Sequence, residues 1–457
     1  MQWLLKREID EVGPKGGFLA DDMGIGKTIQ LIATILGNPQ LRTLIIVPKS
    51  IVSQWVDEIK KFGPTLTVHT YTGQDRKIKE ANIIITSYSI LSSKKETTLS
   101  QFFWDRIILD EAHEIRNKSS QAFKSVCELK SSIRWVVSGT PVFNSMRDFV
   151  SLCTFFGLPK NVVQGRTSKI KETYILRRTK EDLAHANERL RLPPCHFENV
   201  ELDMYPEEKK FYECAFLEAQ ETIRESFMNA QSISAKNMLI LECLLRARQC
   251  MVLPQMYLDG IAKKNETEVE NWSGRSKKME TLFEMVRQHP TEKTLIFCQF
   301  RGEMNHIQKS LATEAGPIYR IDGSVSSEER TRRIKAFKDA PPGAVFIIQI
   351  KCGGQGLNLQ EATRVYITAP SWNPASELQA IGRAHRTGQT QKVYVKKLIY
   401  KATDTFVSVE EEMMALQGHK SIICSQVLND ERIKNQIPVK TTKDKISILD
   451  IKKIFKA

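Results

Sequence analysis

Residues 17–30 read GFLADDMGIGKTIQ, and this stretch decides the predicted fold. The apolar run Gly17–Ala20 precedes a loop with two glycines, and the loop opens a segment with the apolar spacing of a helix. Glycines let backbone N–H groups approach phosphate oxygens closely, and the N-terminus of a helix favours negative charge. The stretch therefore predicts a strand, a phosphate-binding loop and a helix in an α/β domain that binds a nucleotide.

The loop carries the residues that we expect to bind ATP. Lys27 would reach the β- and γ-phosphates, and the Thr28 hydroxyl would hold Mg²⁺. Position 21 is Asp where the full phosphate-loop pattern has glycine, so the prediction depends on the strand–loop–helix context, and a chance match is the alternative. The predicted ATP-binding residues are Asp22, Met23, Gly24, Ile25, Gly26, Lys27 and Thr28.

Several short apolar runs rich in β-branched residues follow the loop. Charged stretches with helical spacing, such as Ser53–Phe62, separate them. Apolar strands that alternate with helices predict a parallel sheet covered on both faces. Residues 1–185 are therefore predicted to form one α/β domain. The runs are Leu44–Val47, Ile83–Thr86, Ile107–Leu109 and Trp135–Val137.

The sequence DEAH, residues 110–113, follows the apolar run Ile107–Leu109. Acids at the carboxyl end of a parallel strand point into the crevice where ligands bind. Asp110 is expected to coordinate Mg²⁺, and Glu111 to orient or deprotonate the attacking water. Two acids at a strand end are often only a helix cap, and the phosphate loop upstream favours the catalytic interpretation. His113 would couple this site to the next strand.

The sequence SGTP, residues 138–141, ends another buried run. The hydroxyls of Ser138 and Thr140 could hydrogen-bond the acids and respond to the γ-phosphate. As an isolated turn, this motif would carry little information.

Gln379, Arg383 and Arg386 lie in QAIGRAHR and have spacings of four and three residues, which predicts one shared helical face. Arginines on such a face could enter the nucleotide site from a second domain and stabilise charge on the transferred phosphoryl group. We therefore count these three residues with Lys27 and the acid pair as candidate catalytic residues. The alternative is a solvated basic face.

Three segments follow the first domain. Residues 186–276 are predicted to be a helical insertion and linker, because 206–252 lacks β-branched runs and 260–276 is polar. Residues 277–415 repeat the alternation of strands and helices and predict a second parallel α/β lobe. Residues 416–457 are a basic C-terminal tail, for which a surface helix or frayed end is the plain interpretation. The strands predicted in the second lobe are Thr294–Cys298, Ile318–Ile321, Ala344–Ile350, Arg364–Thr368 and Val393–Leu398.

The chain is basic, with 67 Lys and Arg against 53 Asp and Glu and a net charge of +14. This balance fits a polyanion-binding surface, and it also fits solvated lysine faces. No apolar run approaches the ~18 residues that a membrane span needs, and the N-terminus lacks a secretory pattern. The nine cysteines include no CxxC pair, which argues against zinc and for reduced thiols in a cytosolic or nuclear setting.

In this order, the motifs resemble those of the SWI/SNF family of helicase-like motors, DEAH-box members of helicase superfamily two. The resemblance spans residues 17–415, and DDMGIGKT together with GRAHRTGQ separates this family from RNA helicases that share the DEAH letters. The other matching stretches are LIIVPKSIVSQWVDEIKKF (44–62), IITSYSIL (84–91), VVSGTPVFN (136–144), YILRRTKEDL (174–183), TLIFCQF (294–300), IDGSVSSEER (321–330) and KCGGQGLNLQEA (351–362).

The resemblance implies two RecA-like lobes of parallel sheet with ATP and Mg²⁺ as cofactors. It implies a monomeric motor that translocates along double-stranded DNA, usually without separating the strands. Contact with the DNA backbone would be tolerant of sequence and sensitive to salt. The residues expected near DNA by this resemblance are Pro48, Lys49, Ser50, Thr86, Tyr88, Gly353, Gly354 and Asn358.

The chain departs from the family pattern in two places. It begins MQWLLKRE and lacks the upstream glutamine segment that commonly recognises adenine, so hydrolysis is better supported than a strict preference for ATP. The segment 186–276 has too few and too poorly spaced cysteines for the RING finger found in one subgroup, so no zinc or ubiquitin-ligase module is expected. We expect a nearly bare motor, as a virus or another compact genome would encode, in the nucleus, a viral factory or a virion.

Three functions remain open at this point. The preferred one is a DNA-dependent ATPase that translocates on double-stranded DNA and remodels or displaces bound proteins in transcription, chromatin or repair. The second is a strand-separating DNA or RNA helicase, although the insertion shows no hairpin signal. The third is a catalytically inactive DNA-binding scaffold, and the residues that argue against it are the intact Lys27, Asp110, Glu111, Arg383 and Arg386.

Overall fold

The computed structural model describes residues 1–73, 76–93, 98–139, 146–188, 191–228, 232–314, 316–353, 357–403 and 406–415, with 452, 454 and 455. The described chain divides into two compact units, each built on one parallel sheet. The first holds residues 1–192 with the short segment 386–388, and the second holds 193–385 and 389–415. The predicted fold class, two parallel α/β lobes, is confirmed.

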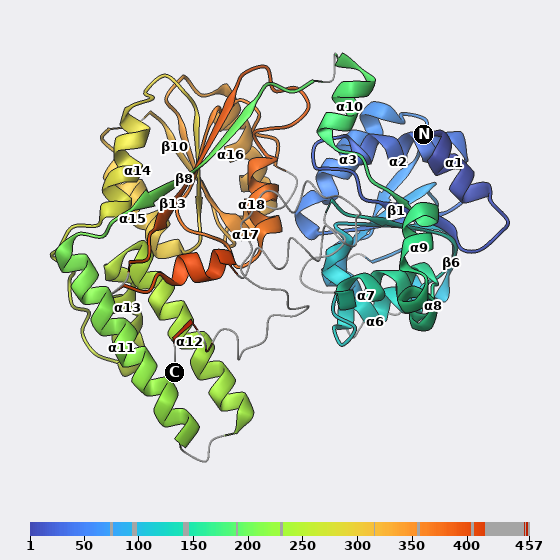
Figure 1. Ribbon diagram of the computed structural model, residues 1–457. Coiled ribbons are helices and arrows are strands. Elements are labelled where there is room, and N and C mark those ends of the chain that lie inside the picture. Colours follow the sequence, from blue (N-terminus) through green and yellow to red (C-terminus); the bar gives the residue numbers. More distant parts are fainter. Residues whose placement is uncertain are drawn as a thin grey trace. The chain divides into compact units, whose positions relative to one another are not determined.

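The first unit is built on seven strands. They are β1 Lys15–Leu19, β2 Thr43–Val47, β3 Val68–Thr70, β4 Ile83–Ser87, β5 Phe103–Asp110, β6 Lys130–Val137 and β7 Ile175–Leu176. All pairs are parallel, in the order β3-β4-β2-β5-β6-β1-β7 (Figure 1). Along β2, Leu44 and Ile46 belong to one core cluster and Ile45 and Val47 to another, because successive side chains point to opposite faces. Each apolar run predicted as a strand lies in this sheet.

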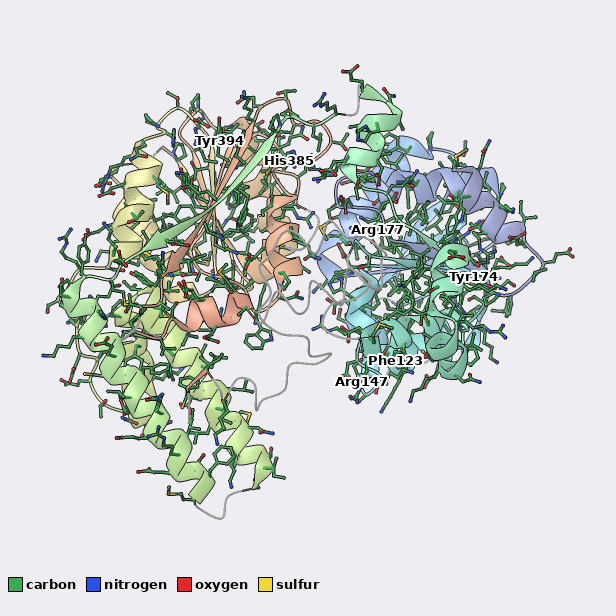
Figure 2. The ribbon with its side chains drawn as sticks, in the orientation of Figure 1. Phe123, Arg147, Tyr174, Arg177, His385 and Tyr394 are labelled. Carbon is green, nitrogen blue, oxygen red and sulfur yellow. The ribbon has the colours of Figure 1, made fainter. Side chains whose placement is uncertain are left out.

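Helices cover both faces of the first sheet. Their bounds are α1 Gln2–Ile9, α2 Lys27–Gly37, α3 Val52–Phe62, α4 Tyr88–Leu91, α5 Thr98–Gln101, α6 Gln121–Glu128, α7 Met146–Phe156, α8 Lys160–Gly165, α9 Thr167–Tyr174 and α10 Lys180–Ala186, with the 3-10 helices η1 Lys49–Ile51 and η2 Ala112–Ile115. Buried residues of α1, α2 and α3 share one cluster, and those of α4 and α6–α9 share the other. Figure 2 shows side chains filling the space on both sides of this sheet.

A buried ion pair fastens α1 to the first sheet. Glu8 is 2% exposed, and its carboxylate accepts two hydrogen bonds from the Arg106 guanidinium on β5, at 2.6 and 2.5 Å. Trp135 Nε1 and Asn38 Nδ2 donate to the same carboxylate at 2.8 and 2.7 Å. Both carboxylate oxygens of Glu8 therefore accept hydrogen bonds inside the unit, and removal of the carboxylate would take an acceptor from each of these donors.

The second unit is built on six strands. They are β8 Cys195–Leu202, β9 Thr294–Cys298, β10 Ile318–Ile321, β11 Val345–Gln349, β12 Arg364–Ile367 and β13 Val393–Tyr400, all parallel, in the order β10-β11-β9-β12-β13-β8. The five predicted strands are present with small shifts of their ends. The sixth corrects the prediction, because β8 lies in the segment 186–276 that we expected to be helix and linker. It pairs with β13 over its whole length but is mostly exposed, so no apolar run marks it.

Helices accompany the second sheet throughout the described part of this unit, and residues 409–415 are helical in addition to the eight whose bounds follow. They are α11 Pro206–Met228, α12 Ile233–Val252, α13 Pro254–Asn265, α14 Lys277–Arg287, α15 Arg301–Leu311, α16 Ser327–Asp339, α17 Ile350–Gly353 and α18 Pro374–Ile381. The insertion helices α11, α12 and α13 share a core cluster with α14 and with Ile296 and Ile347 of the sheet. None of the described helices is long and apolar enough to traverse a lipid bilayer. Most of the predicted tail, 416–457, lies outside the described residues.

Candidate nucleotide-binding site

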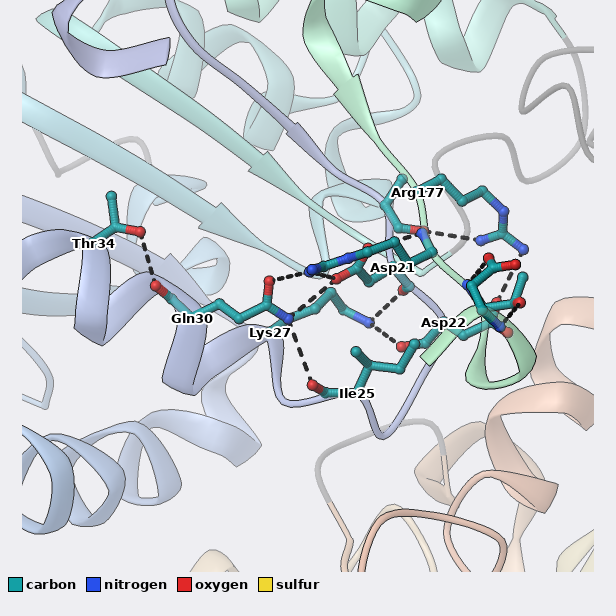
Figure 3. A network of polar contacts seen from close by, with 11 residues as sticks. Asp21, Asp22, Ile25, Lys27, Gln30, Thr34 and Arg177 are labelled. Carbon is teal, nitrogen blue, oxygen red and sulfur yellow. Dashed lines mark hydrogen bonds and ion pairs between the residues drawn. The ribbon is translucent and has the colours of Figure 1, made fainter. Parts of the chain in front are cut away.

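The predicted phosphate-binding loop lies between β1 and α2 of the first unit (Figure 3). Gly24 and Gly26 have φ angles of +86° and +82°, a left-handed conformation that residues with a side chain rarely adopt. Gly26 is the N-cap of α2, and Lys27 and Thr28 are the first two residues of that helix. The first N–H groups of a helix have no partner within the helix, so they are available to an anion held by this loop.

Lys27 bends back over its own loop. Its Nζ donates to the backbone carbonyls of Asp21 and Asp22 at 2.8 and 3.1 Å. Burial lowers the pKa of Lys27, and the nearby carboxylates, with Glu111 and Asp110 first, oppose that shift. Neutral carbonyls are weaker acceptors for an ammonium group than anionic oxygens. A phosphate entering the loop would therefore replace them as the partner of this lysine.

Two arginines that follow β7 hold the acids of the loop (Figure 3). Because β7 pairs with β1, Arg177 and Arg178 come next to Asp21 and Asp22. Arg178 donates to Asp21 Oδ1 from its backbone N–H at 2.9 Å and from Nε at 3.2 Å. Arg177 Nη2 donates to Asp22 Oδ1 at 3.0 Å. These contacts give the aspartate at position 21, where the general pattern has glycine, a structural role.

The two acids of the predicted catalytic pair lie at the end of β5. Asp110 is the last residue of that strand, and Glu111 is the N-cap of η2. Glu111 has φ of +48° and ψ of +47° and is one of two non-glycine residues with positive φ in the described part of the chain. Such a conformation costs about 1–3 kcal/mol and persists where the surroundings impose it, often at active sites. The fold thus fixes the backbone of the proposed base.

The surroundings of Asp110 shift its pKa. Burial, reinforced by the negative charge of Glu111, raises the pKa of Asp110 to about 6, and the hydrogen bond from Trp55 opposes the rise. A bound divalent cation would reverse both effects, because it favours the ionised carboxylate. The group is therefore suited to exchange a proton for a metal ion near neutral pH.

Asp110 is held by two aromatic donors that sequence reasoning did not assign to this site. Trp55 Nε1 on α3 donates to Asp110 Oδ2 at 2.8 Å. The Tyr88 hydroxyl at the start of α4 donates to the backbone carbonyl of Asp110, also at 2.8 Å. Both side chains are buried, so the donors have fixed positions. A lone Trp on an amphipathic helix is usually a core residue, and its spacing gave no sign of this contact.

Replacing Trp55 with Phe should keep the packing of α3 and remove the N–H that stabilises ionised Asp110. Hydrogen bonds to charged groups contribute about 1.5–3 kcal/mol, so loss of this one should raise the pKa of Asp110 further above its ordinary value. We expect the acid limb of the pH profile of hydrolysis to move to higher pH and the Mg²⁺ requirement at pH 7 to increase. Trp104→Phe is the matched control, because its Nε1 donates to the Leu99 carbonyl instead. An acid limb that stays in place would contradict the assigned contact.

Two of the three predicted coupling residues, Ser138 and His113, belong to the described residues and lie beside the loop and the acids. Ser138 follows β6, and its backbone N–H donates to the Leu19 carbonyl at 3.2 Å. A Cβ atom at the next residue, Gly139, would come within 3.1 Å of Met23 Cγ, so this turn packs directly on the loop. His113 Nδ1 lies 3.4 Å from Glu111 Oε2. Thr140 lies outside the described residues.

Comparison with known families agrees with this arrangement of sheet, loop and acids. Residues 1–164 match the model described as SNF2-related domain, and residues 277–388 match the model described as helicase conserved C-terminal domain. The chain belongs to the SNF2-related family of helicase-like ATPases. The resemblance seen in the sequence motifs is confirmed.

Relatives of this SNF2-related chain differ greatly in length. It is 30% identical over 507 residues to human "DNA excision repair protein ERCC-6-like", and the match covers 92% of this chain and 40% of that one. It is 28% identical over 467 residues to the "Probable global transactivator" of Orgyia pseudotsugata multicapsid polyhedrosis virus, with 95% and 92% covered. A solved "Sulfolobus solfataricus SWI2/SNF2 ATPase core in complex with dsDNA" is 29% identical, covers 96% of both chains and has a TM-score of 0.40. The chain spans about half, or less, of the first curated relatives.

Of the SNF2-related motifs predicted to lie near DNA in the first unit, one follows β2 and the other spans the end of β4 and the start of α4. Pro48 is the N-cap of η1, which contains Lys49 and Ser50. Thr86 and Tyr88 are buried, and both side chains are hydrogen-bonded within the unit. A ligand bound at the segment Thr86–Tyr88 would therefore contact the backbone or adjacent residues, because both of these hydroxyls are already hydrogen-bonded.

The remaining predicted DNA contacts belong to the second unit. Gly353 is the last residue of α17, and Asn358 is half-buried. Gly354 lies outside the described residues. Their assignment to DNA stays a prediction.

The single helical face predicted for Gln379, Arg383 and Arg386 is wrong. Helix α18 ends at Ile381, and Gly382 is its C-cap. The backbone N–H of Arg383 then donates to the carbonyl of the residue three positions earlier, at 3.1 Å, which is the geometry of a turn. Glycine has a low helix propensity, and it stops the helix before either arginine. Gln379 and Arg383 are both buried, at 5% and 8% exposure, and the catalytic roles of all three residues remain predictions.

Proposed function

We propose that the protein is a DNA-dependent ATPase that binds Mg²⁺ and ATP in the first unit and translocates on double-stranded DNA. The observation that carries this proposal is that the loop after β1 and the acids at the carboxyl end of β5 belong to the same edge of one parallel sheet, where Lys27 interacts electrostatically with Asp110 and Glu111. A phosphate-loop lysine facing a metal-binding acid and a base is the arrangement that nucleotide hydrolysis needs.

Each residue of the site has a distinct task in this proposal. Lys27 holds the β- and γ-phosphates, while Thr28 and Asp110 offer the hydroxyl and carboxylate oxygens that Mg²⁺ prefers. Glu111 orients the water and accepts its proton. Bound ATP would supply the phosphoryl group that this water attacks, and bound Mg²⁺ would offset the negative charge of its phosphates. The backbone of residues 22–26 cradles the phosphates, and the residues proposed to stabilise the developing charge are Gln379, Arg383 and Arg386.

The contacts of Asp110 support a connection between duplex DNA and hydrolysis. Trp55 lies on α3, which follows the proposed DNA segment Pro48–Ser50, and Tyr88 ends the proposed segment Thr86–Tyr88. A shift of either segment on binding DNA would move a hydrogen-bond donor of Asp110. The net charge of +14 supports binding to a polyanion.

The biological task proposed for this motor is the remodelling or displacement of proteins bound to DNA. Relatives named for DNA repair and for transactivation by a virus support a role in repair, chromatin or transcription. We propose that it acts as a monomer, in the nucleus or in a viral compartment.

The proposal is tested by measuring ATP hydrolysis with no nucleic acid, duplex DNA, single-stranded DNA and RNA in parallel. Strong stimulation by the duplex, absent in Lys27→Ala, is the expected result. Stimulation only by single strands or RNA would point to a strand-separating helicase. Hydrolysis that no nucleic acid changes would leave an ATPase without the proposed partner, and no hydrolysis at all would leave a binding scaffold.

A further inference from the structure

The second unit contains a cavity of about 850 Å³ that plays no part in the nucleotide site. Its walls come from α12 and α13 of the insertion, from the residues just after β9, and from residues at the end of β11 and just beyond it. The cavity is strongly basic, because six cationic side chains and one carboxylate, Asp259, line it. The cations are Arg246, Arg248, Lys263, Lys264, Arg301 and Lys351.

Most of these cations form no ion pair with a carboxylate of the described residues. Lys264 pairs with Glu242 at 2.9 Å, and Arg301 Nε lies 3.7 Å from Asp322. The other four cations form no ion pair with any residue in the described ranges. Positive charge gathered in a concave surface raises the local concentration of anions.

Two of the arginines are built into the wall of the cavity. Arg248 lies 5.6 Å from the centre of the Phe300 ring; burial lowers its pKa, and the carboxylates of Glu410 and Glu303 oppose that shift. Arg246 packs against Gly260, where a Cβ atom would come within 1.7 Å of Nη1. Its buried Nε has no hydrogen-bond partner among the described residues. A glycine inside a helix costs about 1 kcal/mol relative to alanine, and here it makes room for a guanidinium.

Arg246 and Arg248 are partly buried, and a cation that is shielded from water without an ion pair is stabilised when another anion binds it. Phosphate oxygens suit arginine, because its planar group can donate two parallel hydrogen bonds to them. Each strand of a duplex presents one negative charge per ≈3.4 Å of the helix axis, so one strand can serve several of these side chains at once. Lys351 also opens the stretch 351–362, which contains the proposed DNA contacts Gly353 and Asn358.

We propose that this cavity binds phosphodiester groups of duplex DNA, which makes the helical insertion a second DNA-contacting part of the motor. The inference rests on the proposed function and adds to it a surface from α12 and α13. The arginines bind the DNA backbone, and the exposed Lys263 and Lys351 supply positive charge at the rim of the cavity.

The test is the salt dependence of binding to a duplex of random sequence. Each lost phosphate contact should lower the slope of log affinity against log salt by about 0.9. We expect Arg246→Gln with Lys263→Gln to lower the slope by about 1.8 and to weaken binding on the order of tenfold per contact near 0.1 M salt. Lys263→Gln alone removes an exposed side chain and should lower the slope by about 0.9. Hydrolysis without DNA should not change in either variant.

The control is Lys210→Gln with Lys335→Gln, which removes the same charge from exposed sites of the same unit outside the cavity. An unchanged slope in the cavity variants would overturn the inference while duplex-stimulated hydrolysis could still stand. If the control variant lowers the slope by the same amount, the effect comes from the overall charge of the chain, and the inference is overturned as well. If the unaltered chain binds no duplex, the proposed function fails first. A last experiment titrates inorganic tripolyphosphate into the Lys27→Ala variant, with and without the cavity substitutions. If the cavity substitutions abolish tripolyphosphate binding but leave the salt dependence of DNA binding unchanged, the cavity binds free polyphosphate and the inference is overturned.

Discussion

Glu111→Gln is expected to keep ATP binding and to lower turnover by a factor of about 10²–10⁴, the usual contribution of a general base. The amide has the size and shape of the carboxylate but cannot accept the proton of the attacking water. The carboxylate of Glu111 also raises the pKa of Asp110, so its removal favours the ionised form of that residue. Metal and nucleotide binding should therefore survive, and the bound state should accumulate.

The measurement combines nucleotide binding with single-turnover and steady-state hydrolysis in the presence of duplex DNA. Glu114→Gln is the matched control, because Glu114 belongs to η2, carries the same charge and is exposed. Turnover within tenfold of the unaltered chain would remove Glu111 from the role of base. Loss of nucleotide binding would instead indicate that the strained backbone at this position needs the carboxylate.

Glu8→Ala is expected to destabilise the first unit by about 3–5 kcal/mol, the cost of removing one partner from a buried ion pair. Arg106 would keep its charge inside the unit without a carboxylate, and Trp135 Nε1 would lose its acceptor. A change of this size is a large fraction of the stability of an ordinary domain. Denaturant unfolding, followed by a signal from the first unit, measures it.

Glu11→Ala provides the comparison for this experiment, because Glu11 lies just after α1 and is exposed. It should change the free energy of unfolding by no more than about 0.5 kcal/mol. Glu8→Gln should fall between the two, since the amide oxygen can still accept a hydrogen bond. A loss below about 1 kcal/mol in Glu8→Ala would contradict the dependence of α1 on this buried pair.

The features that the sequence predicts well are those written in neighbouring residues. Apolar runs such as Leu44–Val47 predict buried strands, and the glycines at 24 and 26 predict the loop, because each pattern lies within a few neighbouring residues. DEAH after an apolar run places its acids at a strand end for the same reason. The fold class and the family follow from such signals in their order along the chain.

The features that it misses depend on residues far apart. Trp55 meets Asp110 across 55 positions, and Arg178 meets Asp21 across 157, because strands distant in sequence are neighbours in the sheet. The strand β8 is mostly exposed, so it lacks the apolar pattern that reveals its partners. Helical spacing from Gln379 to Arg386 is a local signal that Gly382 interrupts.

The position of β8 determines how the gene can be divided. The chain enters the second sheet at β8, leaves it for the three insertion helices, and returns at β9. A fragment that starts at residue 277, where the sequence alone would place the second lobe, would leave β13 as an open sheet edge. It would also bare the apolar face at Ile296 and Ile347 that the insertion covers. Open edges and large apolar surfaces favour aggregation, so separate expression of the two lobes calls for a cut between Leu192 and Pro193.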